Sequence, residues 1–154
     1  MSTLLNIITC ILGTLGFSIW LKVSKQKLIF TVIGGTISAV IYYFMREAGF
    51  DNFKSTLLAM IAICVYSEVM ARIIKTPANV ILIPSTIPLL PGGFLYSTLS
   101  YLIHADKENF YYYGKETVFV GMGIALGAVI VSIFVTFINT AQKHFKKKNV
   151  QEQE

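Results

Sequence analysis

Long uncharged stretches are the feature that most limits how this chain can fold. Four of them contain no Lys, Arg, Asp or Glu: residues 1–21, 28–45, 76–103 and 117–142. A fifth stretch, residues 55–74, contains only Glu68 and Arg72 as charged groups. A helix needs about 20 apolar residues to cross the ~30 Å hydrocarbon core of a bilayer. The charge pattern therefore predicts five membrane crossings.

The expected fold class is an all-α integral membrane protein. Only 14% of the 154 residues are charged, compared with about 25% in soluble domains. We expect one transmembrane domain over residues 1–142, followed by a basic cytoplasmic tail over residues 143–154. The predicted spans cover about 3–21, 28–45, 55–74, 77–103 and 117–141.

The basic residues predict the orientation. If five spans alternate, nine of the 13 Lys and Arg residues fall on one side, including the C-terminal tail, and four on the other. The positive-inside rule then places the N-terminus outside and the C-terminus inside. An alternative divides 76–103 into two crossings, but the charges then split seven against six and each half has about 14 residues, too short to cross. Residues 110–113, Phe-Tyr-Tyr-Tyr, are expected in an outer loop as an interfacial anchor.

The fourth span is expected to be broken. Residues 84–93 read PSTIPLLPGG, with three prolines and two glycines in ten residues. Proline lacks an amide donor and glycine removes side-chain restraint, so a continuous helix cannot form there. Unwound backbone in a membrane must line a cavity or be covered by protein, and broken helices build substrate sites in many transporters. The alternative interpretation is a proline kink that serves helix packing alone.

Candidate binding residues follow from this break. A second half-helix should begin at Gly92 and Gly93, whose amides are suited to a substrate carboxylate. Ser85 and Thr86 add hydroxyl groups to the same segment. The predicted substrate-binding set is Ser85, Thr86, Pro88, Pro91, Gly92, Gly93 and Tyr96.

Two ionisable residues lie inside the third span. Glu68 and Arg72 are four residues apart and therefore share one helical face. Such groups usually face a bundle interior or water. One interpretation makes Glu68 a proton carrier or cation ligand and Arg72 its partner. The other is a structural salt bridge, with Arg72 reaching the inner headgroups. In the fifth span, Gly123 and Gly127 form a GxxxG pattern that permits close helix contact.

Two segments resemble a known family. Residues 67–77 read SEVMARIIKTP, and residues 87–93 read IPLLPGG, followed by Tyr96. The E-x-x-A-R-x-x-K-x-P signature followed by IPL-[VL]-PG is similar to the C-terminal half of the threonine/serine exporter family (ThrE), which also exists as a small separate subunit of the YjjB type. Leu90 replaces the commoner valine. The five expected spans extend the resemblance over nearly the whole chain.

The resemblance implies an export function. It implies a proton-motive-force-driven exporter of threonine and serine, or of small dicarboxylates such as succinate, in a bacterial cytoplasmic membrane. The full exporter has ten spans, so a YjjP-type partner would supply the other half. Residues 85–93 would line the substrate site, and Glu68 would handle the proton. A homo-oligomer is left open.

Other classes of function remain beside this one. A structural or assembly subunit of a membrane complex and a channel subunit are the alternatives. No nucleophile–base pair, phosphate-binding loop or metal-spaced ligand set is present, so we expect neither an enzyme nor a cofactor or metal. The basic residues adjoin predicted spans, so the expected partners are lipid and a small solute rather than nucleic acid.

Overall fold

The computed structural model describes residues 2–151, with side chains described for 5–138 and 140. These residues form helices joined by short turns, and no strand occurs among them. The elements are α1 (Ser2–Trp20), α2 (Lys25–Glu47), α3 (Asn52–Ile73), α4 (Asn79–Ser85), the 3-10 helix η1 (Ile87–Leu89), α5 (Gly92–Ile103) and α6 (Lys107–Gln151). The expected all-helical fold is confirmed for this part of the chain.

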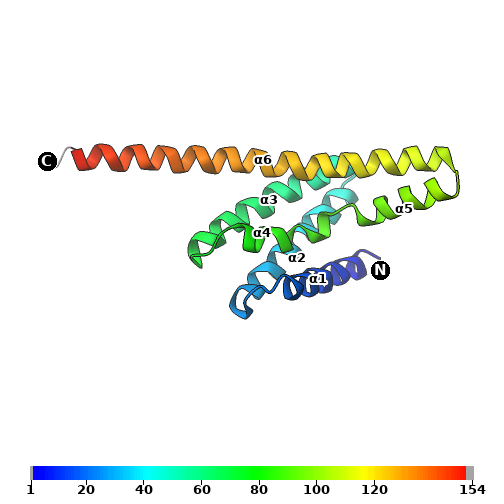
Figure 1. Cartoon of the computed structure of the whole chain (residues 1–154), viewed down its shortest axis with the longest axis horizontal. Helices are drawn as coiled ribbons and strands as arrows, with labels where there is room; N and C mark the ends of the chain where they lie inside the picture. Colours follow the sequence, from blue (N-terminus) through cyan, green and yellow to red (C-terminus); the bar gives the residue numbers. More distant parts are fainter. Residues whose placement is uncertain (1, 152–154) are drawn as a thin grey trace.

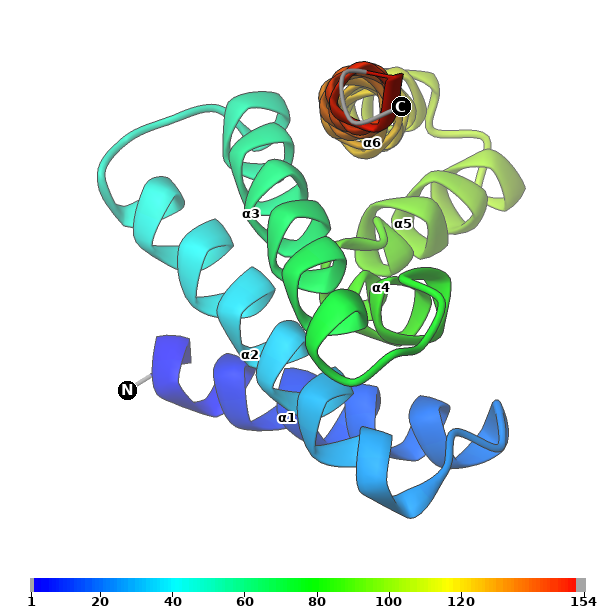
Figure 2. The same ribbon diagram turned by 90° about the vertical axis from the view of Figure 1, so that its left-hand side faces the viewer.

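The helices pack around α2 and α3. Helix α2 contacts α1, α3 and α4, whereas α3 contacts α2, α4 and α6. Helix α5 lies against the first part of α6 (Figure 1). Seen along α6, helices α1, α2 and α3 cross the view obliquely and form one side of the molecule (Figure 2).

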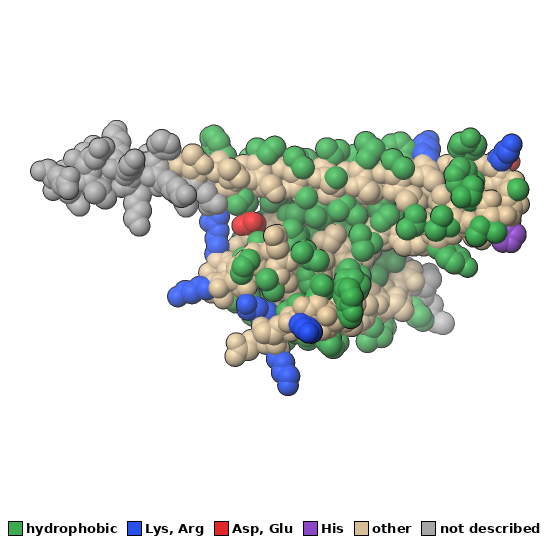
Figure 3. Space-filling view, in the orientation of Figure 1, with side chains coloured by type: hydrophobic (Ala, Val, Ile, Leu, Met, Phe, Trp, Pro, Cys, Tyr) green, Lys and Arg blue, Asp and Glu red, His purple; other side chains and the backbone are tan. Residues whose placement is uncertain are grey.

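The first four predicted spans, counted along the chain, coincide with helical segments. Helices α1, α2 and α3 begin and end within three residues of the predicted spans. The fourth predicted span, residues 77–103, contains α4, η1 and α5, with an interruption inside it. Large apolar side chains are exposed on the outside of these helices, among them Leu12, Ile29 and Val65, as expected for helices surrounded by lipid. Figure 3 shows hydrophobic side chains over the middle of the molecule and Lys and Arg toward its ends.

The last helix is longer than the sequence predicted. Helix α6 begins at Lys107, so residues 110–113 lie in its first turns and not in a loop, and it continues through Gln151. Asp106 explains the early start, because its Oδ1 accepts a hydrogen bond from the Asn109 amide at 3.2 Å and its carbonyl accepts one from the Phe110 amide at 3.0 Å. This is N-capping by a carboxylate. Hydropathy marks the part of a helix that suits lipid, and a helix extends beyond that part where its ends are capped.

Length and composition identify fewer certain crossings than five. Within the described residues, α2, α3 and residues 107–138 of α6 are long and apolar enough to cross a membrane. The pair 79–89 and 92–103 makes a fourth crossing if it is one bent span. The described part of α1, Leu5–Trp20, is apolar but short. The five-span count and its orientation therefore stay predictions.

The GxxxG pattern lies where α6 meets α3. The sequence predicted a close helix contact at these glycines, and the structure shows that the partner is α3. A Cβ on Gly127 would lie 2.8 Å from Met60 Cβ, and one on Gly123 would lie 3.0 Å from the Phe53 carbonyl oxygen. Only glycine permits this approach, because any side chain would overlap with α3. The two glycines thus set the distance between the helices.

Candidate functional site

The fourth span is interrupted where the prolines and glycines predicted. Helix α4 ends at Ser85, η1 covers Ile87–Leu89, and α5 begins at Gly92. Between them Leu90 is extended, with φ −62° and ψ 133°, as expected for a residue that precedes a proline. The segments before and after the break meet at an angle of 50°.

The break lies at half the depth of the bundle. Leu89 is 3% exposed and belongs to one buried cluster with Ala59, Ile63 and Cys64. These three residues occupy the middle of α3. The interruption therefore faces protein at mid-bundle, as a membrane requires of non-helical backbone.

Ser85 is held by packing and hydrogen bonds. Its side chain is fully buried, and its hydroxyl donates to the carbonyl oxygens of Ile81 at 2.8 Å and Thr31 at 3.1 Å. The Ser85 carbonyl accepts a hydrogen bond from the Ser38 hydroxyl at 3.0 Å. In this conformation Ser85 joins α4 to α2 and its hydroxyl is directed away from any open space.

The sequence prediction missed the surface on which Ser85 rests. Helix α2 presents small residues at positions 31, 34, 35 and 38, namely Thr31, Gly34, Gly35 and Ser38, all of them buried. Gly34 contacts the Ser85 side chain and Gly35 contacts the Thr14 side chain of α1. The spacing of three, four and seven residues along FTVIGGTIS is a small-residue stripe that could have been found in the sequence.

A cavity of about 330 Å³ lies beside the break. Pro88, Pro91 and Gly93 line it, so the structure brings three of the predicted site residues together. The other lining residues come from α2, the break, α5 and α6: Tyr42, Tyr43, Leu89, Leu90, Phe94, Ser97, Tyr113 and Val120. Residues distant in sequence thus form one chamber with a mixed polar and apolar wall.

The cavity wall is aromatic and uncharged. Tyr42 and Tyr43 meet edge to face, with ring centroids 5.4 Å apart. Tyr113 stacks on Tyr101 at 5.3 Å, and its centroid lies 6.4 Å from that of Phe94. Aromatic side chains with a few polar groups among them are typical of sites for small organic solutes.

The first turn of α5 is part of this cavity. Gly93 lines it, whereas the Gly92 amide donates to the Leu90 carbonyl oxygen at 2.8 Å. The first amides of a helix have no acceptor within the helix, and the helix dipole is positive at that end. Of the two predicted glycines, Gly93 is therefore the one placed to present backbone to a bound group.

Other predicted residues lie outside the cavity lining. Thr86 is half-buried and donates its hydroxyl to the Leu82 carbonyl oxygen at 2.8 Å. Tyr96 is 75% exposed on the outside of α5. Glu68 is half-buried and Arg72 is exposed, both on α3, which contributes no residue to the cavity wall. Their roles in coupling stay predictions.

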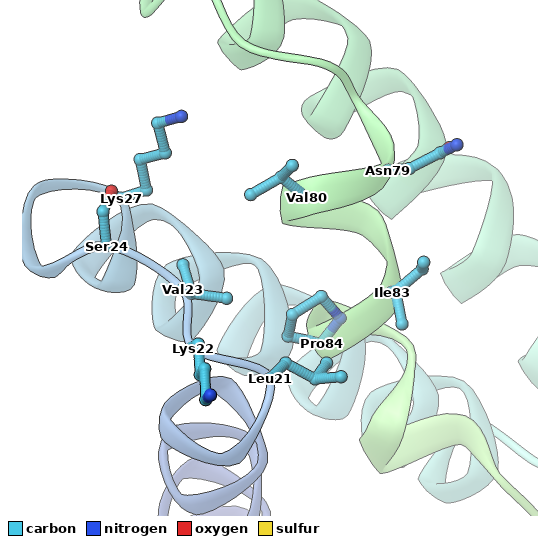
Figure 4. A pocket seen from close by; sticks show the side chains of 9 residues that line it. All are labelled: Leu21, Lys22, Val23, Ser24, Lys27, Asn79, Val80, Ile83 and Pro84. Atoms are coloured by element: carbon cyan, nitrogen blue, oxygen red, sulfur yellow. The ribbon is translucent and has the colours of Figure 1, made fainter.

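A second cavity, of about 430 Å³, lies at the α1–α2 turn (Figure 4). Val23, Val80 and Pro84 form its apolar walls, and the Lys22 and Lys27 side chains leave its rim in different directions. Lys27 Nζ donates to Thr76 Oγ1 at 2.8 Å, which ties the turn before α4 to α2. The two lysines do not converge on a common point in this cavity.

A comparison with known protein families identifies the family of this chain. The family model described as Threonine/Serine exporter, ThrE, matches residues 6–134, and no curated protein or solved structure matches the chain. Because the match covers most of the sequence, the chain belongs to the threonine/serine exporter family, which is a family of transporters. With its several apolar helices it is a multi-pass membrane protein. The resemblance based on the two sequence segments is confirmed.

Proposed function

We propose that this member of the threonine/serine exporter family is the membrane subunit of a proton-motive-force-driven exporter. Its solutes are small hydroxy amino acids such as threonine and serine, or small dicarboxylates such as succinate. The observation that carries the proposal is the cavity of about 330 Å³ at the break in the fourth span. Family membership supports the transport class, and the cavity supports the place where the solute binds.

The wall of the cavity suits an amino acid with a hydroxyl group. The amide end of α5 at Gly93 provides a positive electrostatic environment for the solute carboxylate. The hydroxyl groups of Tyr43, Ser97 and Tyr113 provide hydrogen-bond partners for the polar side chain. The remaining aromatic surface excludes water and limits the size of the solute.

The subunit works with a YjjP-type partner half in a bacterial cytoplasmic membrane. We propose five spans, with the N-terminus outside and the C-terminus inside. The distribution of nine against four basic residues supports this orientation. An odd number of spans in each half makes the two halves antiparallel, which is the arrangement of alternating-access carriers built from inverted repeats.

The experiment that tests the site compares two adjacent glycines. Cells that express both halves are loaded with a threonine-containing dipeptide, and threonine efflux is followed. Gly93→Leu places a side chain in the cavity and should abolish most of the efflux. Gly92→Leu is the matched control, because Gly92 is equally exposed and free of close neighbours but does not line the cavity. Equal efflux from the two variants at equal membrane abundance would contradict the site.

The energy source is tested in the same cells. A protonophore should stop efflux against a threonine gradient while leaving movement down the gradient measurable. Efflux that follows only the threonine gradient, with or without a proton gradient, would indicate a channel and contradict the carrier.

A further inference from the structure

A chain of hydrogen bonds connects the cavity to a carboxylate on α6. Tyr42 lines the cavity and donates its hydroxyl to Asn52 Oδ1 at 3.1 Å. Asn52 Nδ2 in turn donates to Glu116 Oε2 at 2.6 Å. The three residues are half-buried and come from α2, α3 and α6. Two consecutive hydrogen bonds thus connect α6, which bears the carboxylate, to α3 and through α3 to α2.

These residues lie at one end of the bundle. Asn52 is the first residue of α3, and Tyr42 is five residues from the end of α2. Both therefore adjoin the α2–α3 turn, which is on the outer side in the topology proposed above. Protons enter an exporter of this kind from that side.

The cations at this end have contacts of their own. Arg46 Nη1 of α2 donates to the Phe50 carbonyl oxygen at 2.8 Å. Lys54 of α3 pairs with Asp51 at 3.9 Å, and Lys115 of α6 lies 5.5 Å from the centre of the Phe119 ring. Glu47 is the remaining acidic group at the end of α2. Among the described residues no cation lies within 4.0 Å of the Glu116 carboxylate, so its contact with Asn52 is sensitive to its own charge.

We infer that Glu116 is the proton-coupling carboxylate of the exporter and acts on the cavity through Asn52 and Tyr42. The inference rests on the proposed function. An ionised carboxylate accepts a stronger hydrogen bond than a neutral acid does. A proton from the outside binds a Glu116 oxygen and removes its charge, which weakens the hydrogen bond between Asn52 and Glu116. When the cavity that Tyr42 lines opens to the inside, the proton leaves the same oxygen by way of the cavity and enters the inner water.

The coupling is mechanical at the cavity. Asn52 carries no proton, because an amide does not ionise, and it transmits a change of position instead. Helix α5 packs on α6, so weakening of this hydrogen bond lets the walls that contain Phe94 and Tyr113 shift relative to Tyr42. Protonation thereby changes the access to a bound solute, which is what a proton-driven carrier requires.

The test separates coupling from transport. In cells that express both halves, threonine efflux driven by an inward proton gradient is compared with exchange of internal and external threonine at equal pH. Glu116→Gln keeps the acceptor for Asn52 but cannot ionise. We expect it to lose gradient-driven efflux and to retain exchange. Glu108→Gln, an exposed residue in the first turn of α6, is the matched control and should retain both.

The outcomes distinguish this inference from the function on which it depends. Gradient-driven efflux by E116Q equal to that of the wild type overturns the inference alone, as does loss of exchange at normal membrane abundance. Loss of coupling in Glu68→Gln with coupling retained in E116Q would also overturn it. A wild-type complex without efflux overturns the proposed function and the inference with it. If E116Q is absent from the membrane, Asn52→Ala replaces it, and retention of full gradient dependence by N52A overturns the inference.

Discussion

Gly34 offers a direct measure of how tightly α2 holds α4. A Cβ at this position would overlap with the Ser85 hydroxyl and lie 2.9 Å from Ser85 Cβ. The Ser85 hydroxyl cannot withdraw without losing its hydrogen bond to the Thr31 carbonyl oxygen. Gly34→Ala should therefore separate the two helices and destabilise the bundle.

The size of the effect follows from three contributions. Overpacking of a close contact costs about 1–3 kcal/mol. Loss of the Ser85 hydrogen bond adds about 0.5–1.5 kcal/mol. Replacing glycine with alanine within a helix stabilises the helix by about 0.5–1 kcal/mol, which offsets part of this loss. The expected net loss in free energy of unfolding is about 0.5–4 kcal/mol, from these values together.

The measurement is unfolding of the purified protein in mixed micelles, with helix content followed as the fraction of denaturing detergent rises. Gly16→Ala on α1 is the matched control, because a Cβ there meets nothing within 4 Å. It should unfold at the wild-type detergent fraction or above it. The pair Gly34→Ala with Ser85→Gly should regain part of the stability that Gly34→Ala loses, since the second change removes the overlapping atoms. Wild-type stability of G34A, or strict additivity of the two changes, would refute the packing described for α2 and α4.

Two further predictions concern α6. Gly127→Ala should destabilise the α3–α6 contact by about 1–3 kcal/mol in the same unfolding assay, because its Cβ would lie 2.8 Å from Met60 Cβ, whereas Gly121→Ala, with nothing within 4 Å, should not. At the start of α6, hydrogen bonds from the Asn109 side chain and backbone hold the pKa of Asp106 below its usual value. A lowered pKa means that this cap stabilises the helix above the usual pKa of aspartate and is lost as the pH falls through the lowered pKa. Hydrogen exchange of the Asn109 backbone amide, corrected for the intrinsic exchange rate, should therefore accelerate on acidification in the wild type. In Asp106→Ala the corrected rate should be fast at every pH. In Asp106→Asn it should be slow and should not change with pH. An unchanged exchange rate in D106A would show that the cap does not order the first turn.

Local chemistry accounts for what the sequence predicted well. The interruption of the fourth span follows from Pro88, Pro91 and Gly92 themselves, since each alters the backbone of its own residue or its neighbour. The start of α5 at Gly92 is a property of the same kind. A close helix contact at Gly123 and Gly127 was also predictable, because a helix fixes the spacing of its small residues. That α3 is the partner is known only from the structure.

Tertiary packing decided which residues form the candidate site. Ser85 and Gly93 come from the same broken segment, yet one is buried against Gly34 and the other lines the cavity. Which of the two residues is buried and which lines the cavity depends on the bend of 50° at the break and on the position of α2. Tyr42 and Tyr113 could not be assigned to the cavity from their own neighbours in sequence.

By itself, the sequence determined that this protein is helical, that it belongs in a membrane and that its fourth span is interrupted. These properties depend on hydropathy and on backbone restraints, which act over a few residues. Only the tertiary structure decided that the interruption opens onto a chamber walled by α2, α5 and α6, and that Glu116 reaches its wall through Asn52. Those relations depend on the angles and distances between helices, which are set by the summed packing of side chains far apart in the chain.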